Sequence, residues 1–476
     1  MALEFIVPGM QIDESDVGTR PTEQLSLSRI GIVGTFQKGL VNTPTTIGDE
    51  TQFAKVFGVD KPGLTGPKTV KGCLAQGAND LSIVRIIGDG AAAAELILED
   101  EDANSSIQVK ATSPGIWGND LKVTVAINSP AVDITVTDGD SIDFFRAVDL
   151  NKLPLTKNLV TLSKAAGTVG AVNLPKAVDK VSLSGGNDGA AVTDTEYIGT
   201  ITPSGKRSGL KALEPVQCGL AVCAQQYSAN IHHALITWAE NCSVDEGLRI
   251  PVLSAPPGFG VDAACVQTQM LDTPSGRGVF AYPWVTPEDE LDDEVFVSPD
   301  GYYAGRLAVL NPHQSPSNKP ILGIRKLEGD YVYANVKALT QARISPITLV
   351  RGRGFRIRNG VTLSSDTAWN QINIRRQQDK MEMDLYHSMQ WAISEDHDKP
   401  LWEAITTQAD AYLQVQTNLG FIKGFLPTLC NEQTNPPENI INRILIFVIR
   451  WKPLYAADFI IMKMKRELPT SDTNAN

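Results

Sequence analysis

Histidine and serine are the residues with which this chain could perform nucleophilic catalysis, and neither is well placed for it. A serine hydrolase needs a nucleophilic serine, a histidine base and a carboxylate that orients the base. Ser254 follows a short apolar run but lacks the flanking glycines of a GxSxG nucleophile elbow. The sequence therefore favours no hydrolase site, and a degenerate α/β hydrolase is kept only as the remote alternative. The chain has five histidines: His232, His233, His313, His387 and His397.

A zinc site is the second kind of chemistry to consider, around His232, His233 and Cys242. Neighbouring residues of a helix point about 100° apart, so consecutive histidines cannot face one ion. Surface and boundary histidines are the better interpretation, and we expect no metal, cofactor or catalytic site. Without a CxxC pair, the six cysteines are typical of free thiols in a reduced compartment: Cys73, Cys218, Cys223, Cys242, Cys265 and Cys430.

Two glycine-containing tracts resemble phosphate-binding loops only in part. Residues 185–189 (GGNDG) lack the Lys-Ser/Thr pair that follows the glycines of a P-loop. Residues 205–209 (GKRSG) have a lysine and a serine, but no glycine-rich lead-in and no strand directly before them. We interpret the first tract as a turn at a domain junction, and neither tract indicates nucleotide binding.

Arginines concentrate in residues 351–358 (RGRGFRIR), where they surround an aromatic ring. Such a cluster can hold single-stranded nucleic acid. The formal net charge of -12 opposes this function, because neutralising phosphates requires a basic face. We favour a strand whose arginines pair with the acidic tracts 99–102 or 288–294, on this subunit or on an adjacent one.

The length and composition indicate a folded, soluble protein of several domains. A chain of 476 residues with 42% hydrophobic and 20% charged residues is ordinary for such proteins. The longest aliphatic run, residues 444–449, is far shorter than the roughly 20 residues of a membrane-spanning helix. The N-terminus shows no basic region followed by an apolar stretch, so we expect no secretory signal and no membrane insertion.

The residue pattern changes several times along the chain. Residues 1–27 are polar and interrupted by proline and glycine, which predicts an extended arm. Residues 121–127 and 132–136 alternate between apolar and polar types around a turn at Ser129-Pro130. This period of two is typical of antiparallel strands with one face in water, so we expect a small β-sandwich over residues 91–184.

A different rhythm follows the β-rich segment. A first strand is predicted from the alternate residues Val216, Cys218, Leu220 and Val222, and two more from residues 250–253 and 278–282. Ile231, Leu235 and Trp238 lie on one face of an intervening helix. Strands alternating with helices predict a parallel α/β layer. Beyond residue 351 we expect amphipathic helices around residues 381–392 and 401–413, then two β segments at residues 443–451 and 459–465.

Sequence blocks near the end of the chain resemble the C-terminal domain of contractile-tail sheath proteins. In order they are AWNQINIRR (368–376), QWAISE (390–395), KPLW (399–402), NEQTNPPE (431–438) and AADFII (456–461). Further upstream, PGIWGNDL (114–121) and LSAPPG (253–258) also resemble family segments, so the resemblance extends from residue 8 to about residue 468. The polar residues 377–380 depart from the family, which usually continues with an aromatic residue.

The resemblance implies an α/β and α+β multidomain fold. The expected parts are a subtilisin-like α/β layer without a triad, an inserted β-sandwich, a C-terminal α+β domain, and extended N- and C-terminal arms. The expected boundaries are 1–27 for the N-terminal arm, 28–90 for the N-terminal part of the core, 91–184 for the β-sandwich, 185–350 for the α/β domain, 351–468 for the C-terminal domain with its closing strand, and 469–476 for a loose tail.

The implied function is that of a structural subunit, not an enzyme. Such subunits polymerise as a helix around a tail tube and contract by rigid-body rearrangement, which drives the tube through the target cell envelope. The expected partners are further copies of the chain, a tail tube protein, and baseplate and tail terminator proteins, without direct contact to nucleic acid. The expected location is the virion tail, after assembly in the host cytoplasm. The alternative is the sheath of a bacteriocin-like or other non-phage contractile injection system.

The resemblance also implies which residues contact partners. In the family, the two arms pair with strands of neighbouring subunits, because an unpaired strand offers open N–H and C=O groups. Arg375, Arg376 and Lys380 are candidates for contacting an acidic tube surface. The candidate arm-pairing residues are Phe5, Ile6, Val7, Ile12, Phe459, Ile460, Ile461 and Met462.

Overall fold

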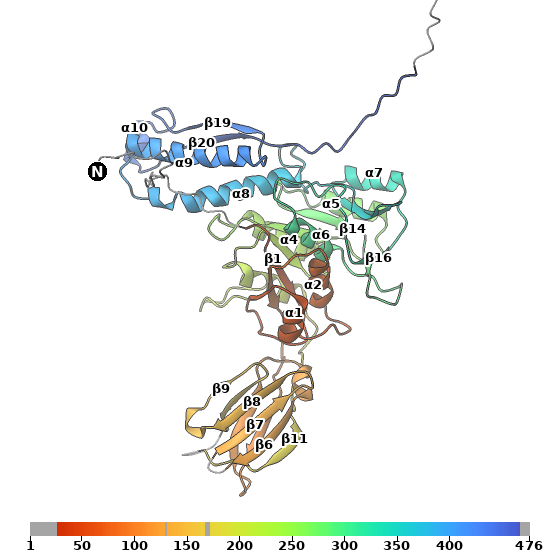
Figure 1. Cartoon of the computed structure of the whole chain (residues 1–476), viewed down its shortest axis with the longest axis vertical. Coiled ribbons are helices and arrows are strands. Elements are labelled where there is room, and N and C mark those ends of the chain that lie inside the picture. Colours follow the sequence, from red (N-terminus) through yellow and green to blue (C-terminus); the bar gives the residue numbers. More distant parts are fainter. Residues whose placement is uncertain (1–25, 129–130, 167–171, 467–476) are drawn as a thin grey trace, which may run out of the picture. The chain divides into compact units, whose positions relative to one another are not determined.

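The computed structural model describes residues 26–128, 131–166 and 172–466, which form a mixed α/β fold of several sheets (Figure 1). Two compact units are distinguished by their internal contacts. Among the described residues, one unit consists of residues 26–380 and 455–466, and the other of residues 381–454. The candidate arm residues Phe5, Ile6, Val7 and Ile12, and the predicted turn at Ser129-Pro130, lie outside the described residues.

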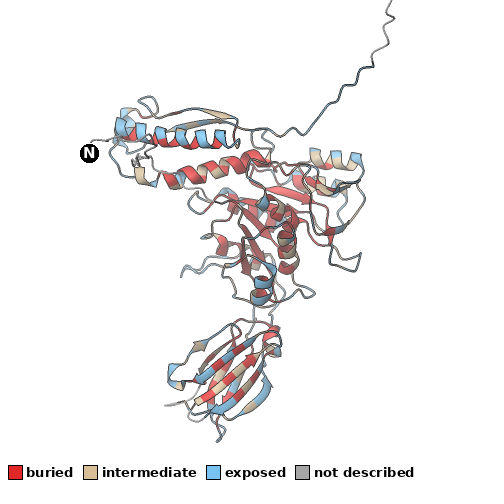
Figure 2. Cartoon of the chain, in the orientation of Figure 1, coloured by how far each residue is buried: buried red, intermediate tan, exposed pale blue. Residues whose placement is uncertain are grey.

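The larger unit is built on an eight-stranded sheet with the order β18-β17-β14-β13-β12-β1-β3-β2. Its six inner strands run parallel, and the two edge strands are antiparallel to their neighbours. Most of the inner strands are buried along their length, which explains their continuous apolar sequences (Figure 2). The strands are β1 (Ile30–Gly34), β2 (Thr45–Ile47), β3 (Leu81–Arg85), β12 (Leu220–Cys223), β13 (Ile250–Ser254), β14 (Val279–Tyr282), β17 (Ser345–Val350) and β18 (Gly354–Ile357).

Helices cover both faces of this sheet. Because side chains alternate along a strand, Ile32 of β1 joins one apolar cluster and Val33 joins the other. The first cluster contains α1 (Glu50–Phe57), α2 (Gly66–Ala75) and α6 (Asp300–Val309). The second contains α3 (Asp194–Ile198), α4 (Ala229–Glu240), α5 (Val261–Gln269) and α7 (Tyr333–Gln341). The predicted parallel α/β layer is thus present.

The pairing of α2 and α6 depends on glycine. A Cβ atom at Gly301 would lie 2.3 Å from the Thr69 carbonyl oxygen, and one at Gly305 would lie 2.7 Å from the Cys73 Cα atom. Only glycine allows the two helix backbones to approach this closely. The close approach lets side chains of both helices pack in the same apolar cluster.

Two four-stranded antiparallel sheets, β4-β5-β10-β9 and β11-β6-β7-β8, share one apolar core. Burial alternates along β6 and β7, as the period of two predicts (Figure 2). The strands are β4 (Glu95–Glu99), β5 (Ser105–Ala111), β6 (Lys122–Asn128), β7 (Ala131–Thr137), β8 (Ile142–Val148), β9 (Leu155–Thr156), β10 (Val160–Lys164) and β11 (Val178–Ser182).

The smaller unit contains α9 (Lys399–Asn418), α10 (Pro437–Ile441) and the hairpin β19 (Gly424–Leu429) to β20 (Val448–Lys452). It also contains the end of α8 (Ile372–Ser388). Asp398 starts α9 by accepting the Leu401 amide at 3.0 Å. The smaller unit has an apolar cluster of its own, which includes Ile405, Tyr412 and Leu413 of α9.

Two predicted strands are shorter than expected. The strand predicted over residues 216–222 begins only at Leu220, because the Val216 amide bonds the Leu213 carbonyl in a turn. The strand predicted over residues 443–451 begins at Val448. Before it, the Asn435 side chain takes both backbone groups of Ile446, accepting its amide at 2.7 Å and donating to its carbonyl at 2.9 Å. These groups are therefore unavailable for a ladder.

Arg85, at the end of β3, holds several loops together. It is 1% exposed and donates to the carbonyls of Phe36, Gly39 and Pro114 at 3.0, 3.0 and 2.9 Å. Burial lowers its pKa to about 10, so it stays charged at neutral pH.

We predict that Arg85→Met lowers the free energy of unfolding by about 3 kcal/mol, because buried carbonyls lose their donors. The control Arg29→Met removes a part-exposed pair with Asp80 (2.8 Å) and should cost about 1 kcal/mol or less. Urea unfolding of the full chain measures both. Equal losses for the two variants would contradict the role assigned to Arg85.

Candidate assembly interface

Among the residues that the structure describes, the strands β19 and β20 form a two-stranded antiparallel hairpin. Its inner face carries Phe425, Ile449 and Trp451, which pack against the cluster around α9. Beside the strand pair, Asp410 of α9 accepts the Thr428 amide at 2.9 Å. An edge strand with unpaired backbone groups is a template for a strand from another chain.

Apolar side chains lie exposed around this hairpin. Large apolar surfaces facing water mark interaction sites in folded proteins. The exposed fractions are 79% for Ile441, 48% for Ile444, 42% for Leu426, 42% for Ile446 and 38% for Val448.

The residues from Tyr455 to Arg466 form no regular secondary structure, although the sequence predicts a strand at residues 459–465. The strand prediction is wrong for the isolated chain, because a strand is defined by a hydrogen-bonded partner and the described residues supply none here. Figure 1 shows this segment as an extended dark-blue trace. Its apolar side chains are almost fully exposed: Phe459 90%, Ile460 87%, Ile461 82%, Met462 79% and Met464 87%.

Arg375 and Arg376, the candidate tube-contacting residues, are buried, with exposed fractions of 6% and 2%. Arg375 donates to Asp379 at 2.6 Å and lies over the Trp369 ring at 4.5 Å. The Asp379 carboxylate also accepts a hydrogen bond from Arg277 at 2.9 Å, so it is shared by two buried arginines. The guanidinium of Arg375 is therefore held inside the larger unit.

Arg376 donates to the Leu310 carbonyl at 3.3 Å, and burial lowers its pKa to about 10. A side chain must be exposed to touch a partner, so the placement of both arginines corrects their prediction as tube contacts. They serve instead to fix the start of α8 within the larger unit. Lys380 is half-buried, and its contact with a tube stays a prediction.

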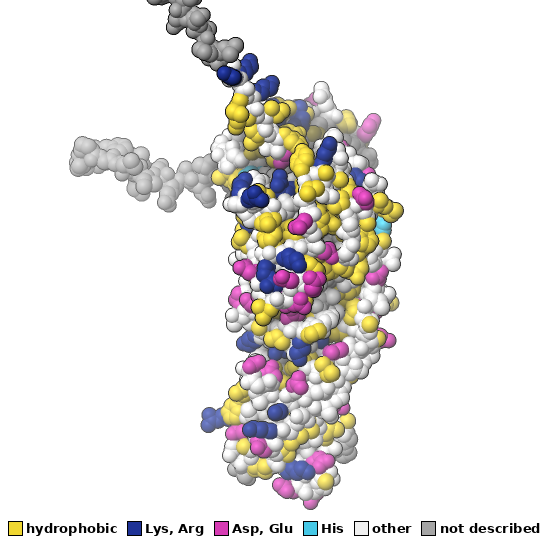
Figure 3. Space-filling model, turned by 90° about the vertical axis from the view of Figure 1, so that its right-hand side faces the viewer, with side chains coloured by type: hydrophobic (Ala, Val, Ile, Leu, Met, Phe, Trp, Pro, Cys, Tyr) yellow, Lys and Arg dark blue, Asp and Glu magenta, His cyan; other side chains and the backbone are white. Residues whose placement is uncertain are grey.

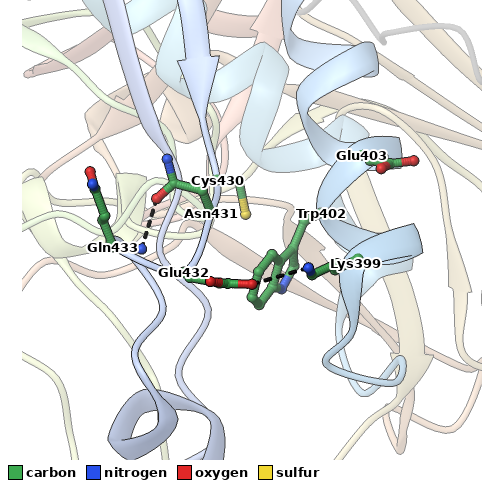
Figure 4. Close-up of a pocket in the computed structure, with 7 residues that line it drawn as sticks. All are labelled: Lys399, Trp402, Glu403, Cys430, Asn431, Glu432 and Gln433. Carbon is green, nitrogen blue, oxygen red and sulfur yellow. Dashed lines mark hydrogen bonds and ion pairs between the residues drawn. The ribbon is translucent and has the colours of Figure 1, made fainter.

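A surface hollow of about 390 Å³ lies between α9 and the loop after β19 (Figure 4). Lys399 and Glu432 form an ion pair of 3.0 Å across its rim, with Trp402 beside them. Both charged side chains are more than 70% exposed, so the pair contributes little to stability. The remaining lining residues are Glu403, Cys430, Asn431 and Gln433.

The residues considered for catalysis do not assemble a nucleophile and base. The Ser254 hydroxyl bonds the Ser298 hydroxyl at 2.7 Å, not a histidine. His232 is buried, which corrects its prediction as a surface or boundary residue, and its ring packs edge-on against Phe280. Burial lowers its pKa to about 4, so it is neutral at physiological pH. Within the described ranges, no cluster of His, Cys, Asp and Glu has the geometry to hold a metal ion.

The arginine tract lies on the hairpin between β17 and β18. Residues Arg351, Arg353 and Arg358 are exposed, and no carboxylate of the described chain pairs with them. The predicted pairing with this subunit's acidic tracts is therefore wrong. Those tracts use other cations, such as Arg325 for Asp293 (2.7 Å) and Lys176 for Glu99 (2.9 Å). The face in Figure 3 shows acidic and basic side chains interspersed, without the broad basic surface that nucleic acid requires.

None of the helices in the described part of the chain is both long and apolar enough to cross a lipid bilayer. Together, the multilayer fold and the exposed apolar segment around Phe459 are features of a protein that associates with other chains.

Comparisons with known proteins agree with this class. Residues 190–363 match the phage tail sheath protein central domain, and residues 364–466 match the phage tail sheath C-terminal domain. The chain therefore belongs to the tail sheath protein family of contractile phage tails and contractile injection systems. Proteins of this family are structural.

Individual relatives are distant in sequence and similar in fold. The tail sheath protein of Burkholderia phage BcepMu is 21% identical over 458 residues, which cover 91% of each chain. The sheath tail protein of Listeria innocua has a TM-score of 0.68 at 14% identity, covering 92% of this chain and 94% of that one. The contracted helical sheath of the anti-feeding prophage has a TM-score of 0.57 at 14% identity, covering 97% and 99%.

Sequence reasoning missed Asp300, a buried carboxyl group of the larger unit. It is 1% exposed at the start of α6, where it accepts the Gln225 amide at 3.0 Å and the Thr69 hydroxyl at 3.3 Å. Burial raises its pKa to about 6 in spite of these bonds. Its position directly after Pro299, before a helix, was the only available signal.

We predict that Asp300 makes folding depend on pH. A carboxyl group whose folded pKa is raised stabilises the fold fully below its unfolded value of 3.8, and this stability is lost as pH rises through about 6. As the pH rises from 3.8 to about 6, the free energy of unfolding of the wild type should fall by roughly 3 kcal/mol relative to that of Asp300→Asn. Denaturation curves at pH 4, 5, 6 and 7 measure the difference. The free energy of unfolding of the exposed control Asp140→Asn should change with pH as that of the wild type does. The same pH dependence for Asp300→Asn and the wild type would refute the prediction.

Proposed function

We propose that this chain polymerises as a helical sheath around a tail tube, and that the sheath drives the tube through a target cell envelope by contracting. The observation that carries the proposal is the apolar segment from Phe459 to Met462, which is 79–90% exposed. Such a run is unfavourable in water, at about 25 cal/mol per Å² of apolar surface. In this proposal the segment would add as a strand to the hairpin β19–β20 of a neighbouring copy.

This pairing is heterologous, because a segment of one copy contacts a different surface on the next. Heterologous contacts do not close between two copies and therefore generate rings or helices. The relatives include a helical sheath in its contracted state, a baseplate and an extracellular contractile injection system. For this chain the partners would be further copies, a tail tube protein, and baseplate and terminator proteins.

In the proposed mechanism, subunits first assemble in an extended, metastable lattice templated by the tube. A signal from the baseplate releases them, and they turn as rigid bodies while the strand pairings persist. The energy is stored in the lattice, so the mechanism needs no nucleotide at the subunit. The β-sandwich of residues 91–184 would face outward, and the C-terminal domain of residues 351–468 would face the tube, with Lys380 near it.

The remaining parts follow the same proposal. Residues 1–27, with Phe5, Ile6, Val7 and Ile12, form the N-terminal arm, and residues 469–476 a loose tail. Residues 28–90 and 185–350 form the α/β body, which the proposal describes as subtilisin-like and without a triad. The assembled sheath belongs to a virion tail after assembly in the host cytoplasm. The second candidate, a non-phage injection system, is favoured by the anti-feeding prophage and PVC neighbours.

We predict that prolines in the C-terminal segment abolish assembly. Ile460→Pro with Met462→Pro removes two backbone donors and prevents a continuous ladder. Negative-stain microscopy of the full-length chain, alone and co-expressed with its tube protein, should show no cylinders. The matched control, Ile460→Ala with Met462→Ala, keeps the donors and should still form cylinders.

Both pairs should leave monomer stability unchanged, because these side chains are exposed in the subunit. Cylinders of normal length from the proline variant would exclude strand addition by this segment.

A further inference from the structure

The tip of the β17–β18 hairpin is an exposed, preformed basic turn. Arg351 and Arg353 flank Gly352, whose φ of +73° allows the chain to reverse. The turn is closed by the Arg353 amide, which donates to the Val350 carbonyl at 2.9 Å. Arg356 braces it by donating to the Arg353 carbonyl at 3.2 Å and to the Asn318 carbonyl at 2.6 Å.

This hairpin also exposes an apolar side chain beside its charges. Leu349 of β17 is 65% exposed and lies opposite Phe355 in the strand register. An exposed leucine with a rim of unpaired arginines has the composition of a docking surface with an apolar centre. We call Leu349, Arg351 and Arg353 the basic hairpin surface.

The loop between β15 (Val285–Pro287) and Val297 is complementary to the basic hairpin surface: it is acidic and also exposes an apolar side chain. Residues 288–294 contain six acidic side chains around Leu291, which is 91% exposed. The Asp289, Asp293 and Glu294 carboxylates pair with Lys71, Arg325 and Lys326. Glu288 and Asp292 are exposed and form no ion pair within the described chain.

Hydrogen bonds within the acidic loop fix its conformation, as they do in the basic hairpin. The Glu290 carboxylate accepts the Leu291 amide at 3.1 Å, and the Asp292 carboxylate accepts the Glu294 amide at 2.9 Å. Preformed surfaces lose little conformational entropy when they bind. We call Glu288, Leu291 and Asp292 the acidic loop surface.

We propose that the basic hairpin surface of one copy docks on the acidic loop surface of another copy. Opposite charges would pair at the rim while Leu349 and Leu291 bury each other at the centre. A second copy is the occupant that the chain itself favours. Every copy carries both surfaces in equal number, the arginines find no partner within the described part of their own subunit, and the net charge of -12 disfavours a polyanion such as nucleic acid.

This contact deepens the proposed function, on which it rests, by adding a second heterologous contact between subunits. The two contacts differ in the forces that hold them: the arm pairing uses backbone hydrogen bonds, and this contact uses charges at its rim. Backbone ladders are directional and short in range, whereas exposed charges act over a screening length of about 10 Å at 0.1 M salt. The contact therefore weakens as salt rises, and the arm pairing does not.

The test is charge reversal with mutual rescue in the full-length chain. Arg351→Glu with Arg353→Glu, and separately Glu288→Lys with Asp292→Lys, place like charges opposite each other. Each pair should raise the protein concentration needed for self-association at low salt at least about tenfold, measured by sedimentation velocity. Combining all four substitutions in one chain should restore association, because every copy then carries both reversed surfaces.

The control Lys122→Glu with Lys206→Glu changes the net charge as much as the arginine reversal does, at exposed sites elsewhere, and should leave association unchanged. Three results would overturn the proposal: a wild type that does not associate at low salt, reversals without effect, or absence of rescue in the fourfold variant. Loss of tube binding with normal self-association would assign the arginines to the tube instead. Cylinders that persist in the reversal variants would leave the proposed sheath function standing while refuting this contact.

Discussion

The exposed apolar segment from Tyr455 to Arg466 is the feature on which the proposed assembly depends. This segment has no ladder partner among the described residues. Backbone that is removed from water is stable only when its N–H and C=O groups form hydrogen bonds. The chain keeps these groups exposed together with the apolar side chains of Phe459 to Met462. In the proposed sheath, another copy would cover this segment and pair with its backbone.

A subunit that is joined to its neighbours in this way would need rigid parts to hold its contact surfaces in position. The larger unit provides rigidity through parallel strands buried on both faces, and through buried charges such as Arg85 and Arg376. The smaller unit has its own apolar cluster around α9. Buried ionic groups contribute little net stability but are costly to disrupt. They therefore favour one arrangement of each unit over alternatives, which suits parts that move as rigid bodies.

The sequence predicted what depends on local pattern. Continuous apolar runs located β13 and β14, alternation located β6 and β7, and the stripe through Ile231 located α4. It failed where a distant residue decides the outcome. The contact between Arg277 and Asp379 joins residues 102 positions apart, so the burial of Arg375 beside them could not be read from the tract itself. The late start of β20 depends likewise on the Asn435 side chain. Residues 459–465 are apolar enough for a strand but have no hydrogen-bonded strand partner among the described residues.

A lattice that must first persist and then rearrange requires contacts with different responses to displacement. A backbone ladder breaks when its register shifts by one residue, because every hydrogen bond is lost together. Charged surfaces tolerate sliding, because the Coulomb energy falls gradually with distance. In the proposed sheath, the strand pairings would therefore keep neighbours attached while the basic hairpin and acidic loop surfaces change partners or separation. The leucine at the centre of each surface would favour one docked position over a continuum, since apolar burial is gained only at contact.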